Sequence, residues 1–141
     1  MGKSSTREKG KRFERRIRQY LESLGWTVDV ARAAIHFIGP GKCFSSQCDF
    51  FGCADLICIK PDKPYTLFIQ AHAGEAYAKK RKDLELVKWS PAQRVQLWVP
   101  QEGILSGVRV FHLSAIHDDQ TDWSEYIFRV KDGSEPPQGV L

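Results

Sequence analysis

Polar residues interrupt two apolar stretches in the middle of the chain, where polar side chains are costly to bury. Asp55 lies at the head of the stretch Ala54–Ile59, and Gln70 and His72 lie near the end of the stretch Thr66–Ala71. Strand side chains alternate between faces, so Gln70 and His72 point the same way, and a hairpin places Asp55 roughly opposite them. Each such group costs about 1–3 kcal/mol if it is buried without a partner. The pattern therefore favours a functional site over simple packing.

A further candidate, Glu14, lies on the predicted first helix. The apolar residues of this segment recur at the spacing of a helix with one core-facing side, and they are Phe13, Ile17, Tyr20, Leu21 and Leu24. Glu14 falls at the edge of that stripe, where a carboxylate must find a cation, a donor or a metal. A surface salt bridge to Arg18, four residues later, is the plain alternative.

Two other carboxylates compete for the acidic role. Asp49 lies six residues before Asp55, and its alternative role is to form a turn. Glu75 follows Gly74 at the expected start of the second helix, where a carboxylate in the first turn is common. Both are second-rank candidates.

Positive charge is concentrated at the N-terminus. The first 18 residues contain eight Lys or Arg and two Glu, a net charge of +6 in a chain whose formal net charge is +4. A basic helix suits the phosphate backbone of a nucleic acid, and a solvated helix face explains it equally well. The candidate DNA-contacting residues are Lys9, Lys11, Arg12, Arg15, Arg32, Lys42, Lys79 and Lys80.

The elements that must position these residues are helices and strands in mixed order. Helices are predicted up to Leu24 and over Glu75–Lys88, with an irregular stretch at Ala33–Asp49. Strands are predicted at Trp26–Ala31, Ala54–Ile59, Thr66–Ala71, Val95–Val99 and Val108–Leu113, with Trp123–Val130 a last strand or helix. This order predicts an α/β fold, a mixed β-sheet flanked by helices, in one domain over residues 1–131. Residues 132–141, rich in Gly and Pro, are predicted to be a disordered tail.

Composition and cysteine spacing limit the class of protein. With 42% hydrophobic and 27% charged residues and no long apolar run, the chain is expected to be soluble, without a membrane partner. The charged N-terminus lacks an apolar signal core, which predicts a cytoplasmic location. Cys43, Cys48, Cys53 and Cys58 recur every five residues, unlike the paired cysteines of common zinc sites. A zinc-stabilised interaction protein with His36 as a further ligand remains an alternative.

The order of these features resembles the core of the PD-(D/E)XK nuclease superfamily. A helix with a glutamate is followed by a strand that ends in Arg, a loop, a strand with an aspartate, and a hairpin partner with two polar residues two positions apart. The opening EKGKRFERRIRQYLESLGWTVDVARAA is similar to archaeal-type Holliday junction resolvases and their phage relatives. Those enzymes begin with a Gly-x-x-x-Glu-Arg helix, a Leu-x-x-x-Gly turn and a strand that ends in Arg. The resemblance covers roughly residues 8–113 and implies a restriction-endonuclease-like core.

The resemblance also implies roles for particular residues. Glu14 matches the first-helix glutamate and Asp55 the metal-binding aspartate, whereas Gln70 replaces the usual Glu or Asp and His72 the usual Lys. A glutamine carbonyl can ligate a hard cation without adding charge, so Mg²⁺ is expected to bind less tightly than to three carboxylates, and Mn²⁺ can serve instead. His72 can act as a general base, a positive stabiliser or a ligand. Lys79 or Lys80 is a candidate for the missing lysine charge.

The implied activity is metal-dependent, structure-selective hydrolysis of phosphodiesters in branched DNA, such as the four-way junction. A homodimer is implied as well, because symmetric resolution of a junction needs two active sites related by a twofold axis. The nearest alternatives are a repair or restriction nuclease of the same fold and a DNA-binding module that has lost its activity through the changes at Gln70 and His72.

Overall fold

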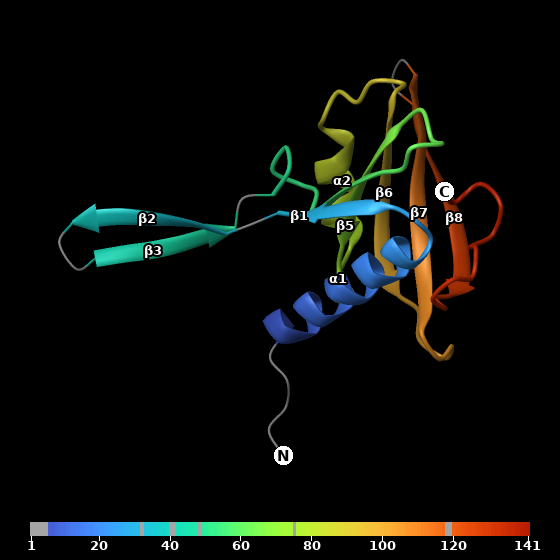
Figure 1. Ribbon diagram of the computed structural model, residues 1–141. Helices are drawn as coiled ribbons and strands as arrows, with labels where there is room; N and C mark the ends of the chain where they lie inside the picture. Colours follow the sequence, from blue (N-terminus) through green and yellow to red (C-terminus); the bar gives the residue numbers. More distant parts are fainter. Residues whose placement is uncertain (1–5, 32, 40–41, 48, 75, 118–119) are drawn as a thin grey trace.

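The computed structural model describes residues 6–31, 33–39, 42–47, 49–74, 76–117 and 120–141 (Figure 1). The helices are α1 (Thr6–Ser23) and α2 (Ala78–Glu85). The strands are β1 (Thr27–Val30), β2 (Ala33–Gly39), β3 (Lys42–Gln47), β4 (Leu56–Ile59), β5 (Thr66–Ala71), β6 (Gln93–Pro100), β7 (Gly107–His117) and β8 (Gln120–Arg129). No helix of the described ranges is long and apolar enough to cross a membrane.

Six strands form one mixed sheet in the order β1-β4-β5-β6-β7-β8. Neighbouring strands run antiparallel except β5 and β6, which are parallel. A parallel pair needs a crossover connection, and α2 lies within that connection. The predicted α/β fold, with a mixed sheet and flanking helices, is confirmed.

Apolar residues of the central strands alternate between two core clusters, which is the period-two pattern of a sheet covered on both faces. In the first cluster, Ile17 and Leu21 of α1 are fully buried together with Leu67 and Ile69 of β5. In the second, Leu84 of α2 is fully buried among the other faces of β6 and β7. The helical stripe that was predicted for the first segment therefore packs on the sheet as expected.

The irregular stretch predicted between Ala33 and Asp49 is instead largely β structure. β2 and β3 pair antiparallel as a separate two-stranded ribbon, which extends away from the body of the molecule in Figure 1. In the sequence of β2, Ala33, Ile35 and Phe37 occupy alternate positions, and the residues Gly-Pro-Gly close the segment. The prediction weighted the Gly, Ser and Cys content of the stretch and missed this alternation.

The second helix is shorter than predicted: it covers Ala78–Glu85, whereas the prediction was Glu75–Lys88. Its N-cap residue, Tyr77, makes no side-chain capping hydrogen bond, and Leu84 is its buried residue. With so little burial and no cap, propensity alone does not extend the helix.

The prediction of a disordered tail over residues 132–141 is wrong. Val140 is fully buried in the α1-side core, and its carbonyl accepts a hydrogen bond from Nε2 of the buried Gln96. The hydroxyl of buried Tyr20 donates to the carbonyl of Ser134 over 2.7 Å. Two buried polar groups, from Tyr20 and Gln96, thus find their acceptors in this segment. These hydrogen bonds hold the segment in place in spite of the Gly- and Pro-rich composition on which the prediction relied.

We expect Val140→Ala to lower the free energy of unfolding by about 2 kcal/mol, because it removes two buried methyl groups and leaves a cavity. Urea denaturation of wild type and variant measures this change. Gln138→Ala, at an exposed position of the same segment, is the matched control and should have little effect. Equal stability of Val140→Ala and wild type would mean that the segment does not pack in solution.

Candidate functional site

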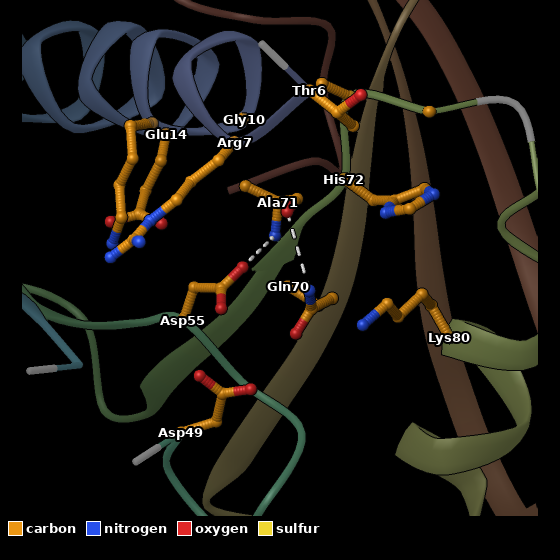
Figure 2. A pocket seen from close by; sticks show the side chains of 13 residues that line it. Thr6, Arg7, Gly10, Glu14, Asp49, Asp55, Gln70, Ala71, His72 and Lys80 are labelled. Carbon is orange, nitrogen blue, oxygen red and sulfur yellow. Dashed lines mark hydrogen bonds between the residues drawn. The ribbon is translucent and has the colours of Figure 1, made fainter. Parts of the chain in front are cut away.

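A pocket of about 530 Å³ lies where the N-terminal half of α1, the loop before β4, the end of β5 and the start of α2 meet. Glu14, Asp55, Gln70 and His72 all line it, so the structure brings the four candidates from the sequence to one place. Figure 2 shows Asp55 and Gln70 on one side of the pocket, with Glu14 extending toward them from α1. Asp49, a second-rank candidate, lines the same pocket.

The hairpin of β4 and β5 sets Asp55 opposite Gln70. Leu56 pairs with Ile69, so the next residues outward are Asp55 and Gln70. The backbone N–H of Asp55 donates to the carbonyl of Ile69 over 2.9 Å, and its Oδ2 accepts from the N–H of Ala71 over 3.0 Å. The carboxylate therefore continues the sheet ladder one step before the start of β4, which fixes its place in the lining of the pocket.

Gln70 and His72 share the face of the sheet that α2 covers, as their spacing predicts. The backbone N–H of His72 donates to the carbonyl of Trp98 over 3.0 Å, while its buried Nε2 has no hydrogen-bond partner among the described residues. Figure 2 shows the imidazole turned away from Asp55. Burial, and then the charge of Lys80, lower the pKa of His72 below its usual range. His72 is thus neutral near pH 7 and able to accept a proton.

Three carboxylates influence each other in the pocket. Burial raises the pKa of Asp55 to about 7; the hydrogen bond from Ala71 opposes this rise, and the charges of Asp49 and Glu14 add to it. Burial also raises the pKa of Glu14, which Lys11 lowers and Asp49 raises. Oδ1 of Asp49 is buried without a hydrogen-bond partner within the described part of the chain. A cation in this pocket would reduce the repulsion between the three carboxylates and would also give Oδ1 of Asp49 a partner.

The basic candidates divide by position. Lys11 and Lys80 line the pocket. Lys9, Arg12, Arg15 and Lys79 are exposed on the helices and do not line it. Arg32 and Glu75 lie outside the described residues, as does the side chain of Lys42.

The sequence analysis missed Arg7, which lines the pocket from the first turns of α1. Arg7, Lys11 and Glu14 follow each other at spacings of four and three residues, and such residues share one face of a helix. That spacing was available in the sequence and could have identified Arg7. The place of Asp49 depends on the loop before β4, for which no periodic signal exists.

The donor groups of the pocket suit a hard divalent cation. Carboxylate and amide oxygens are the ligands that Mg²⁺ and Mn²⁺ take in proteins, and Asp55, Glu14, Asp49 and Gln70 supply them. Within the described ranges, no group of three or more His, Cys, Asp or Glu side chains is arranged to hold a metal as it stands. A cation would therefore draw the carboxylates together from their present positions, and the unpaired oxygen of Asp49 is free to take part.

The cysteines that the structure describes do not favour a zinc site. Cys53 and Cys58 are buried free thiols, and burial raises their pKa values to about 11 and about 12. Zinc binds the thiolate, which these environments disfavour. The side chain of Cys43 and all of Cys48 lie outside the described residues.

Comparisons with protein-family models, with curated proteins and with solved structures find no match to this chain.

Proposed function

We propose that this protein is a metal-dependent endonuclease of the PD-(D/E)XK type that resolves four-way DNA junctions. The observation that carries the proposal is the meeting of Glu14 from α1, Asp55 from the head of β4 and Gln70 from β5 in one pocket. These residues come from three separate elements, and polar side chains that converge in a pocket are the usual mark of an active site. The basic residues around them suit a polyanionic substrate.

A restriction-endonuclease-like core is part of this proposal. Its support is the hairpin of β4 and β5 at the centre of the site, with α1 packed on one face and α2 in the crossover to β6. The acids then lie at the end of the sheet, where the ends of α1 and α2 both contribute side chains.

In the proposed site, Asp55 and Glu14 would hold the divalent cation and Gln70 would add a neutral oxygen. Asp49 supplies the third negative charge that Gln70 does not bring, because its charge acts on both Asp55 and Glu14. Mg²⁺, or Mn²⁺, supplies an activated water and neutralises charge on the phosphoryl group when it is bound.

The side chains beyond the acids have separate tasks. Lys80 reaches the pocket from α2, and its charge acts on both Asp55 and His72, so it takes the place of the usual strand lysine as the positive group beside the phosphate. His72, neutral because of its lowered pKa, would accept the proton of the attacking water only after its imidazole, which points away from Asp55, turned toward the cation. Lys11 and Arg7, which also line the pocket, bind neighbouring phosphates of the DNA strand that is cut.

The test is cleavage of a labelled four-way junction and of a linear duplex of the same sequence, each with Mg²⁺, with Mn²⁺ and with EDTA. We expect paired cuts near the branch in the junction, little cutting of the duplex, and none in EDTA. Cutting of both substrates alike would indicate a repair or restriction nuclease of the same fold. Tight junction binding without cleavage under any condition would identify an inactive DNA-binding module. The homodimer and the cytoplasmic location are further parts of the proposal, and sedimentation of the protein checks the first.

A further inference from the structure

The loop between Asp49 and Asp55 presents an aromatic side chain to solvent. Phe51 exposes 62% of its surface, and its backbone φ is +53°, a region that residues other than glycine rarely adopt. The loop is closed by backbone hydrogen bonds of 2.8 and 3.0 Å between Phe50 and Ala54. A large exposed ring kept in a costly conformation is typical of a functional position.

The ring of Phe51 is held from one side by two other aromatic rings. It meets Phe68 of β5 and Trp89 edge-on, with 5.5 Å between ring centroids in each pair, and the centroids of Phe68 and Trp89 are 5.0 Å apart. Trp89 is itself anchored, because its Nε1 donates to the carbonyl of Leu84 over 2.7 Å. The orientation of the Phe51 ring is thus fixed, while much of its surface stays open.

This aromatic cluster adjoins the candidate site. Phe68 and Gln70 lie two residues apart on the same face of β5, which is about 7 Å along a strand. Asp49, two residues before Phe51, lines the pocket. A DNA strand rises about 3.4 Å per nucleotide in a duplex, so the ring lies within a few nucleotides of a phosphate bound beside Gln70.

We propose that Phe51 is a stacking platform for an unpaired base next to the phosphate that occupies the pocket. The proposal rests on the proposed nuclease function and names the feature of the substrate that the site prefers: a base free to leave its stack, as at a branch or flap. Aromatic side chains combined with basic groups are the usual means of holding single-stranded nucleic acid, and Lys80 and Lys11, which line the neighbouring pocket, supply the basic groups here. A single exposed ring is small compared with the roughly 800 Å² per partner of a stable protein interface, which favours a base over a second copy of the chain.

The test uses a four-way junction and a single-strand flap, each with 2-aminopurine at an unpaired or branch-point position, in EDTA so that no cutting occurs. We expect wild type and Phe51→Trp to quench the 2-aminopurine fluorescence. Phe51→Asn should abolish the quenching and weaken flap binding roughly tenfold or more, because it removes one base stack. Binding of linear duplex should be the same in all three proteins.

Asn is chosen because it tolerates positive φ better than other residues, so the loop keeps its shape, and an unfolding curve verifies the fold of the variant. Equal quenching by Phe51→Asn and wild type would overturn the inference. So would a change from dimer to monomer in sedimentation of Phe51→Asn, since the ring would then be a contact between copies. Because these measurements exclude the cation, intact quenching by a wild-type protein that cuts no DNA would contradict the nuclease proposal and leave the stacking inference standing.

Discussion

Asp55→Asn is expected to lower the rate of junction cleavage at least about a thousandfold while junction binding stays within a few-fold of wild type. The change removes the carboxylate that the β4–β5 hairpin holds at the pocket, and cation-assisted hydrolysis depends on that charge. Asn keeps the shape of the side chain, and its carbonyl can still accept from the N–H of Ala71. Single-turnover cleavage of a labelled junction, with binding measured separately in EDTA, gives both quantities.

Asp62→Asn is the matched control, since Asp62 is an exposed aspartate in the turn between the same two strands, where its Oδ1 lies 3.9 Å from Nζ of Lys60. It should cleave as wild type does. If Asp55→Asn retains full activity, Asp55 serves only to extend the sheet ladder, and the nuclease proposal fails. If both binding and cleavage are lost, an unfolding curve separates a damaged fold from a damaged site.

The second large effect is on how the free energy of unfolding depends on pH. Burial raises the pKa of Asp55 from its ordinary 3.8 to about 7 in the folded protein. Below about pH 3 the carboxyl is protonated in both the folded and the unfolded chain. Between about pH 4 and 7 the unfolded chain releases this proton first, so the free energy of unfolding falls as pH rises, by up to about 4 kcal/mol at pH 8.

Asp55→Asn should remove this pH dependence, so that the variant exceeds wild type in stability at pH 8 and equals it near pH 3. Urea denaturation from pH 3 to 8 without divalent cations measures the difference, in which the titration of groups distant from the pocket cancels. Addition of Mn²⁺ or Mg²⁺ at pH 8 should raise the stability of wild type, by about 2.7 kcal/mol at a hundred times the dissociation constant, and that of the variant much less. A variant less stable than wild type at pH 8 would show that the charged carboxylate supports the fold.

The parts of the fold that follow from periodicity could be predicted from the sequence. The stripe from Phe13 to Leu24 requires a helix with one apolar side, and its buried residues are those that the 3.6-residue period selects. The strand over Thr66–Ala71 has the predicted bounds. Its hairpin with the preceding strand then requires Asp55 to lie opposite Gln70, because opposed residues share a face in an antiparallel pair.

What could not be predicted depends on contacts between distant segments. Asp49 enters the pocket because the loop before β4 closes on itself through Phe50 and Ala54, and loop shape leaves no periodic trace in a sequence. The burial of Val140 depends on Gln96, 44 positions earlier in the chain, whose Nε2 donates to the carbonyl of Val140. The prediction of disorder in that segment relied on its Gly and Pro content. Composition does not show that a single valine is packed in the core.

The burial of Val140 also bears on synthesis of the protein. Because this side chain completes the core cluster around α1 and β6, the domain cannot reach its final packing until Val140 has left the ribosome. Until Val140 is in place, the apolar side chains that it covers stay exposed to solvent. Nascent chains with such exposed apolar surfaces are prone to associate. A ribosome-bound chain stalled before Val140 is therefore expected to resist protease less than the released protein does.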